Sequence, residues 1–86
     1  MKVFIVCEGE RGQGYKISSV SRSFNYATTY IKALNKENAS IEAEFKEEIN
    51  DSDYSCCYIL PDELEIDKPY FTKSGVDYVL IKEFEI

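Results

Sequence analysis

The chain has 86 residues, and its 10 Lys and Arg against 16 Asp and Glu give a net charge of −6. Hydrophobic residues make up 44% of the sequence, which is enough for a core and argues against intrinsic disorder. There is no His, which excludes nucleophiles activated by an imidazole and zinc sites with imidazole ligands. We therefore predict one small domain, residues 1–86, with no enzymatic activity, no cofactor and no metal.

No apolar run approaches the ~20 residues that span a bilayer, and the apolar stretch after Met1 is too short for a signal peptide. We expect a chain that starts at Met1, stays in the cytoplasm of its host cell and has no membrane partner. The three cysteines, Cys7, Cys56 and Cys57, are odd in number and lack the spacing of a disulfide framework. They are predicted to be reduced core residues, and on a strand Cys56 and Cys57 would point to opposite faces.

The first elements in chain order form a predicted hairpin. Residues 2–7 are apolar in both alternating sets, which is typical of a central strand covered on both faces. A polar loop that contains Gly9, Gly12 and Gly14 follows, and residues 15–20 alternate loosely between apolar and polar. This pattern predicts a second strand paired with the first.

A helix is predicted at about 25–36, with Ser23 or Asn25 as its N-cap. Its apolar stripe at helical spacing consists of Phe24, Ala27, Ile31 and Leu34. Residues 40–49 allow two interpretations, because their apolar residues lie four apart, as in a helix, and also alternate with charges, as in an edge strand. The Glu, Ala and Lys content favours the helix only slightly.

The remaining elements are strands and turns. Residues 50–53 predict a turn and residues 54–60 a strand. Leu64 and Ile66 alternate with acids and suggest a short edge strand, residues 69–75 a loop, and residues 76–86 a C-terminal strand. The predicted fold is α+β, an antiparallel-rich sheet of four or five strands with one or two helices packed on one face.

The charge is distributed unevenly along the chain. Residues 1–36 carry six basic and two acidic side chains, a net of +4, and residues 37–86 carry four basic and fourteen acidic ones, a net of −10. Such acids can be a solvated surface that keeps a small protein soluble. They can also dock on a basic partner, such as the nucleic-acid-binding groove of a host or defence protein. The predicted contacts are Glu42, Glu44, Glu47, Glu48, Asp51, Asp53 and Tyr54. Direct nucleic-acid binding is disfavoured because it requires clustered Lys and Arg.

Two alternatives remain open. The spacing of the three loop glycines is similar to that of phosphate-binding loops, so the loop could bind a nucleotide-like anion. The residues for this role are Arg11, Tyr15, Lys16 and Arg22. Phosphate loops lead from a strand into a helix, however, and this loop leads into a second strand. The other alternative is a structural accessory protein that forms oligomers, such as a homodimer paired through edge strands.

Three segments resemble small accessory proteins of phages and mobile elements. They are MKVFIVCEG, then GYKISSV running into FNYATTYI, and YVLIKEFEI at the end. The resemblance implies only a small accessory protein of the kind that phages encode. Small acidic phage proteins often act by binding and blocking a host or defence protein, which agrees with the charge distribution. The resemblance assigns no role to any single residue.

Overall fold

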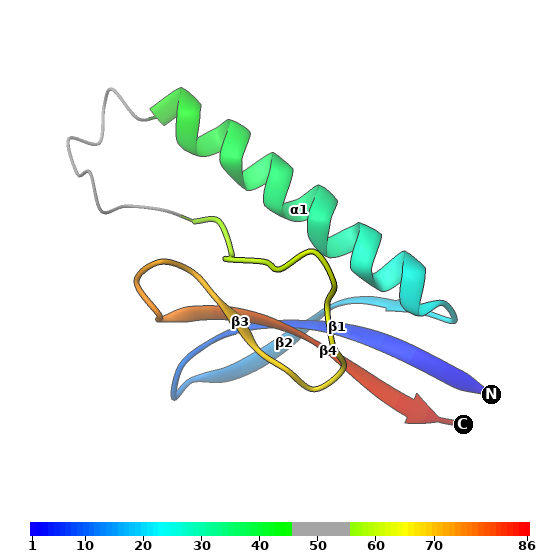
Figure 1. Ribbon diagram of the computed structural model, residues 1–86. Helices are drawn as coiled ribbons and strands as arrows, with labels where there is room; N and C mark the ends of the chain where they lie inside the picture. The colour runs from blue at the N-terminus through cyan, green and yellow to red at the C-terminus, as the bar shows by residue number, and fades with distance from the viewer. Residues whose placement is uncertain (46–55) are drawn as a thin grey trace.

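One long helix lies across one face of a four-stranded antiparallel sheet in the computed structural model, which describes residues 1–45 and 56–86 (Figure 1). The elements are β1 (Lys2–Glu10), β2 (Gly14–Ser21), α1 (Phe24–Phe45), β3 (Tyr70–Phe71) and β4 (Asp77–Glu85). The strands lie in the order β2-β1-β4-β3, and each pairs with its neighbour in antiparallel fashion. This arrangement confirms the predicted α+β architecture. No helix within the described ranges is long and apolar enough to cross a membrane.

β1 and β2 form the predicted hairpin, and β1 lies in the centre of the sheet between β2 and β4. In the turn that joins them, the Gln13 amide donates to the Glu10 carbonyl at 3.0 Å. Gly9 is required near this turn because a Cβ at that position would clash with the carbonyl oxygen of Gly14. The glycines therefore build a strand-to-strand turn, which lacks the helix N-terminus of a phosphate loop.

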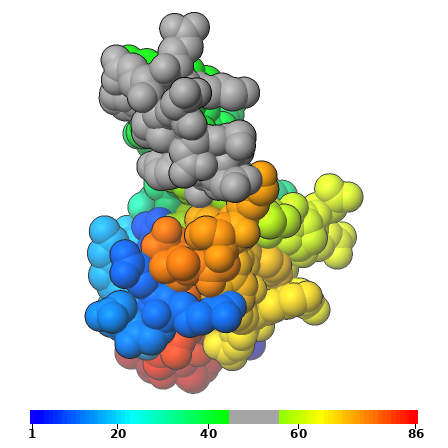
Figure 2. All heavy atoms as spheres, turned by 90° about the vertical axis from the view of Figure 1, so that its left-hand side faces the viewer, coloured from blue at the N-terminus to red at the C-terminus, as the bar shows by residue number. Residues whose placement is uncertain are grey.

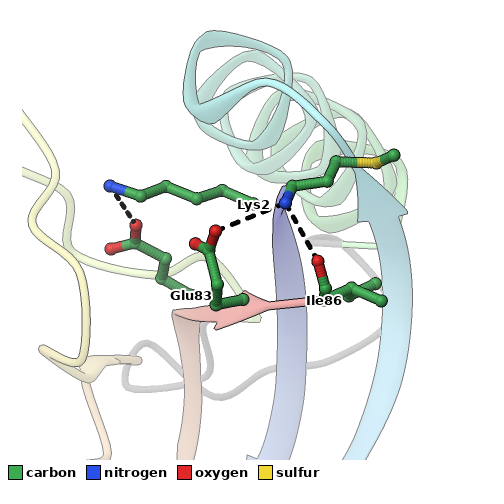
Figure 3. Close-up of polar contacts among 5 residues, drawn as sticks. Lys2, Glu83 and Ile86 are labelled. Atoms are coloured by element: carbon green, nitrogen blue, oxygen red, sulfur yellow. Dashed lines mark hydrogen bonds and ion pairs between the residues drawn. The ribbon is translucent and has the colours of Figure 1, made fainter.

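Polar contacts join the ends of β1 and β4 (Figure 3). The Met1 amine donates to the Ile86 carbonyl at 2.9 Å and lies 3.3 Å from Glu85 Oε1, and the Ile86 amide donates back to Met1 at 2.7 Å. Beside them, Lys2 Nζ lies 3.0 Å from Glu83 Oε1, and this carboxylate raises the pKa of Lys2. The predicted C-terminal strand is thus paired with β1 along its whole length.

α1 begins as the sequence predicts. The Tyr26 amide donates to Ser23 Oγ at 3.1 Å, so Ser23 rather than Asn25 is the N-cap. Ala27 and Ile31 are fully buried, and the rest of the predicted stripe packs against the same core. The apolar spacing therefore identified the face of α1 that packs on the sheet.

The predicted end of the helix at residue 36 is wrong, because α1 continues to Phe45. For residues 40–49 the helical interpretation is confirmed up to Phe45, and the remainder of that segment lies outside the described residues. Asn35 and Asn38 do not end the helix because their side chains donate to backbone carbonyls of a later segment. Polar residues that find such partners do not compete for the helix backbone.

The predicted strand at 54–60 is not present in its described part. There Tyr58 forms an isolated bridge to Thr72, and the chain runs along α1 instead of joining a ladder. The side chain of Asn35 takes the place of a neighbouring strand, since it pairs with both the N–H and the C=O of Tyr58. The predicted turn at 50–53 lies outside the described residues.

The segment before β4 also differs from the prediction. Ile66 forms one parallel bridge, to Ile81, while Leu64 is buried in the core, so these residues do not make an edge strand. The predicted loop at 69–75 contains the two-residue strand β3, which pairs with β4. Together these contacts cover the outer edge of β4.

The core lies between α1 and one face of the sheet. Val6, Val79 and Ile81 point to this face and are at most 1% exposed, in the same cluster as Ile31. The described chain has no helix over the opposite face (Figure 1), yet Val3 and Cys7 of β1 are buried there, in agreement with the predicted cover on both faces of β1. A single helix can pack against only one face of the sheet. On the opposite face the apolar side chains of β2 and the end of β4 are exposed, among them Ile17, Val20 and Phe84.

Candidate binding surfaces

The predicted acidic contacts lie mostly outside the described residues. Glu47, Glu48, Asp51, Asp53 and Tyr54 belong to the undescribed segment. Glu42 and Glu44 lie near the end of α1, where Glu44 is exposed and Glu42 is half-buried. Glu42 Oε2 lies 3.4 Å from the Cys57 thiol. Glu44 is thus the freer of the two to meet a partner.

The four residues predicted to bind an anion are not brought together. The Arg11 guanidinium lies over the Phe71 ring, 4.7 Å from its centre. Arg22 follows the far end of β2, and an eight-residue strand separates the two arginines by about 25 Å. Tyr15 and Lys16 point to opposite faces of the sheet because they are neighbours on β2.

A hollow of about 600 Å³ lies on the α1 side of the hairpin, and Lys16 lines it. Three acids line it as well, Glu8, Glu10 and Asp77. Tyr15 lines the hollow as well, so two of the four predicted anion ligands border it, but the excess of negative charge disfavours a nucleotide-like anion there.

Among the acids of this hollow, Glu8 accepts two side-chain hydrogen bonds. Its half-buried carboxylate accepts a hydrogen bond from the Tyr58 hydroxyl at 2.7 Å and another from the Ser18 hydroxyl. Burial raises the pKa of Tyr58, and the hydrogen bond to Glu8 raises it further. Tyr58 therefore remains a neutral donor, and the pair connects β1 to the segment that runs along α1.

We expect Tyr58→Phe to lower the free energy of unfolding at neutral pH by about 1.5–3 kcal/mol, the range for hydrogen bonds to charged groups. Above the ordinary tyrosine pKa of 10.0, the unfolded chain loses the Tyr58 proton while the folded chain keeps it. The free energy of unfolding of the wild type then falls by up to about 1.4 kcal/mol per pH unit as the pH rises. Tyr58→Phe has no phenol at this position, so its free energy of unfolding should fall less steeply with pH. Urea unfolding at neutral and alkaline pH measures both effects.

The control is Tyr26→Phe, because Tyr26 is 57% exposed on α1. The raised pKa values of Cys7, Lys2 and Lys82 give slopes of the same sign in every variant, so the difference from wild type isolates Tyr58. Equal stability losses for the two substitutions, or parallel alkaline slopes for wild type and Tyr58→Phe, would contradict the role given to the Tyr58–Glu8 contact.

The face of the sheet opposite α1 is apolar, and we call it the open face. The strand registers place on it Val3, Ile5, Cys7, Tyr15, Ile17, Val20, Phe71, Tyr78, Leu80, Lys82 and Phe84. Several of these side chains are well exposed, with Ile17 at 60%, Val20 at 59% and Phe84 at 47%. Large apolar patches of this kind are rare on monomeric proteins and mark interaction sites.

The open face carries no acidic residue on its strands, although the chain as a whole is acidic. Two cations lie against aromatic rings of this face, Lys82 with Nζ 5.0 Å from the centre of the Tyr15 ring and Arg11, from the hairpin turn, over the Phe71 ring. Tyr15 makes the largest contribution to the raised pKa of Lys82, and Asp67, beyond the edge of β4, makes the smallest. Glu8, Glu83 and Asp77 also lie on strands, but their side chains alternate with those of the open face and point to the α1 side.

A groove of about 290 Å³ lies at one end of the open face. Its lining residues are Arg11, Gly12, Pro69, Phe71, Tyr78 and Leu80. The hairpin tip and the turn between β3 and β4 lie next to each other here (Figure 2), and the Arg11 amide donates to the Val76 carbonyl at 2.7 Å. The groove thus combines two aromatic rings with a guanidinium group.

Comparisons with protein-family models, with curated proteins and with solved structures found no match for this chain. The resemblance to phage accessory proteins therefore stays a prediction. The open face was missed by the sequence argument because both alternating sets of β1 are apolar, which predicted cover on both. A signal was present nevertheless, since in the hairpin strands the acids Glu8 and Glu10 share one alternating set and the other set has none.

Proposed function

We propose that this chain is a non-enzymatic protein-binding domain and that its partner docks on the open face. The observation that carries the proposal is the set of exposed aliphatic and aromatic side chains that β2 and β4 place on the open face, namely Tyr15, Ile17, Val20 and Phe84, with no carboxylate among them. Burial of this surface would supply the main favourable free energy of association. Aromatic residues and arginine, which the groove contains, are the usual anchors of protein interfaces.

The charges favour a partner segment that is apolar along one side and carries carboxylates. Arg11 and Lys82 are held against rings at two places on the face, so acids of the partner could pair with both. A second copy of the chain fits less well, because two open faces packed together would bring cations to an interface without acids. Single-stranded nucleic acid also stacks on aromatic faces, but exposed aliphatic residues and two cations suit it poorly.

A labelled amphipathic peptide of Leu and Glu tests the proposal, with a matched Leu and Lys peptide and a single-stranded oligonucleotide as competing probes. We expect the acidic peptide alone to bind, and to shift backbone NMR signals of Ile17, Val20 and Leu80. Arg11→Glu combined with Lys82→Glu should weaken the acidic peptide at least about 10-fold, or 1.4 kcal/mol. The matched control is Lys32→Glu with Lys36→Glu, the same charge change on exposed positions of α1.

Three outcomes would overturn this assignment. The first is preference for the basic peptide, the second is tighter binding of the oligonucleotide, and the third is an equal effect of the two double substitutions. Sedimentation of the free chain tests whether a second copy of the chain occupies the open face. A dimer that buries Ile17 and Val20 would mean that the partner is this second copy.

A second candidate is the acidic surface predicted from the sequence, which would dock on a basic site of a host or defence protein. Exposed acids favour it: Glu44 on α1 and Asp62, Glu63, Glu65 and Asp67 in the segment before β3. The resemblance to phage accessory proteins adds the expectation that such binding blocks the partner. Binding through this surface should weaken steeply with salt, whereas binding dominated by the open face should not.

A further inference from the structure

Three metal-ligating groups converge between the end of α1 and the segment that follows the undescribed residues. The carboxylate of Glu42 and the thiols of Cys56 and Cys57 have their ligand atoms within 4.8 Å of one another. Cys57 Sγ is 3.4 Å from Glu42 Oε2, and Cys56 Sγ is 3.3 Å from the Asn38 carbonyl. Both thiols thus approach α1, whereas the sequence argument placed them on opposite faces of a strand.

The backbone that carries the two cysteines is held in place by α1. Asn35 Oδ1 accepts from the Tyr58 amide at 2.6 Å, and Asn35 Nδ2 donates to the Tyr58 carbonyl at 3.0 Å. Asn38 Nδ2 donates to the Cys56 carbonyl at 3.3 Å. Asn35, Asn38 and Glu42 lie on one side of α1 because their spacing follows the helical repeat. The same helix face therefore positions the cysteines and supplies the third ligand.

We propose that Glu42, Cys56 and Cys57 bind a thiophilic divalent cation of the zinc class. Zinc takes thiolate sulfur at about 2.3 Å and carboxylate oxygen at about 2.0–2.2 Å in tetrahedral geometry, which places an oxygen and a sulfur about 3.5–3.7 Å apart and two sulfurs about 3.8 Å apart. Glu42 Oε2 and Cys57 Sγ, 3.4 Å apart, are already close to this separation, and small side-chain movements bring Cys56 to it. Hard cations are disfavoured because two of the three donors are sulfur. Three protein ligands leave the fourth position to water.

The proton balance gives the site a recognisable signature. Each thiol loses its proton to the solvent when its sulfur binds the cation, whereas a carboxylate binds without releasing a proton. Two protons are therefore released for each cation. Because two protons are released, the affinity should rise by up to about 100-fold per pH unit in the wild type. It should rise only about 10-fold per unit when either Cys56 or Cys57 is replaced by serine.

The spacing of these residues does not predict the site, because Glu42 and Cys57 are 15 residues apart and no known ligand pattern joins them. The prediction that the chain has no metal site rested on the absence of His, which excludes imidazole ligands, and did not consider a carboxylate beside two thiols. Only the course of the chain beside α1 brings the carboxylate to the thiols.

Titration of the whole chain with Co²⁺ under a phosphine reductant, followed by displacement with Zn²⁺, tests the proposal. We expect one Co²⁺ per chain, tetrahedral d–d absorption, and thiolate-to-cobalt charge-transfer absorption that falls by about half in Cys56→Ser or Cys57→Ser, in proportion to the sulfur ligands. Glu42→Gln should weaken binding at least about 10-fold. The controls are Glu44→Gln, an exposed acid on the same helix, and Cys7→Ala, a buried thiol in β1.

A second measurement needs no substitution. Zn²⁺ should protect Cys56 and Cys57 from iodoacetamide in the wild-type chain, so folding defects of the variants cannot decide the result. The proposal is overturned if the charge-transfer band is absent, if Cys7→Ala removes it, or if Zn²⁺ leaves alkylation of the cysteine pair unchanged. A wild-type affinity that rises with pH no more steeply than that of Cys56→Ser or Cys57→Ser would also overturn it.

Discussion

Asn35→Ala should lower the free energy of unfolding by about 2–4 kcal/mol, a large effect for a single polar side chain on a helix. The Asn35 amide group pairs with the N–H and the C=O of Tyr58, whose side chain is 8% exposed. Alanine would leave both backbone groups without a partner in the protein, and each unsatisfied buried group costs about 1–3 kcal/mol. Urea unfolding followed by circular dichroism measures the loss.

Two further variants separate the hydrogen bonds from other effects. Asn35→Asp keeps the acceptor for the Tyr58 amide and removes the donor to the Tyr58 carbonyl. Its free energy of unfolding should therefore lie between the values for wild type and for Asn35→Ala. Asn25→Ala, at an exposed position in the first turn of α1, should change stability by no more than about 0.5 kcal/mol. If Asn35→Ala costs no more than Asn25→Ala, the segment after the undescribed residues is not held on α1 as described.

Ile31→Ala should lower the free energy of unfolding by about 2–5 kcal/mol. Ile31 is fully buried between α1 and the sheet, in the cluster that contains Val6, Val79 and Ile81. Its truncation removes buried methyl and methylene groups and leaves a cavity that the surrounding strands can fill only in part. The same unfolding experiment measures the loss.

The matched control is Ile41→Ala, since Ile41 lies on the same helix and is 44% exposed. Its loss should be less than half that of Ile31→Ala. The folded fraction of Ile31→Ala should still bind the acidic peptide, because α1 packs on the face opposite to the proposed docking surface. Equal losses for the two isoleucines would mean that this face of α1 does not form the core.

The sequence was a good guide wherever the deciding interactions are local. The hairpin, the N-cap at Ser23 and the apolar stripe of α1 were predicted because turn residues, caps and helical spacing act over a few residues. The end of α1 was predicted wrongly, at residue 36, because Asn35 and Asn38 resemble stop signals until their tertiary partners are known. The strand predicted at 54–60 failed for the same reason, because side chains of α1 satisfy the backbone of Tyr58.

The binding surfaces were less accessible to prediction. The division of charge along the chain pointed to an acidic surface, most of whose predicted contacts lie outside the described residues. In the sheet, charge is sorted by strand alternation instead. Glu8 and Asp77 point to the α1 side, while Lys82 remains among the apolar residues of the open face. The part of the chain in which a residue lies does not determine the face of the sheet to which its side chain points.

By itself, the sequence determined the fold class, the hairpin, the start of the helix and the absence of imidazole chemistry, because these depend on composition and on neighbours along the chain. The tertiary structure alone decided which face of the sheet remains uncovered and which side chains meet across α1. The physical reason is the amount of chain available for cover: apolar residues on both faces of β1 call for two layers, and α1 supplies one.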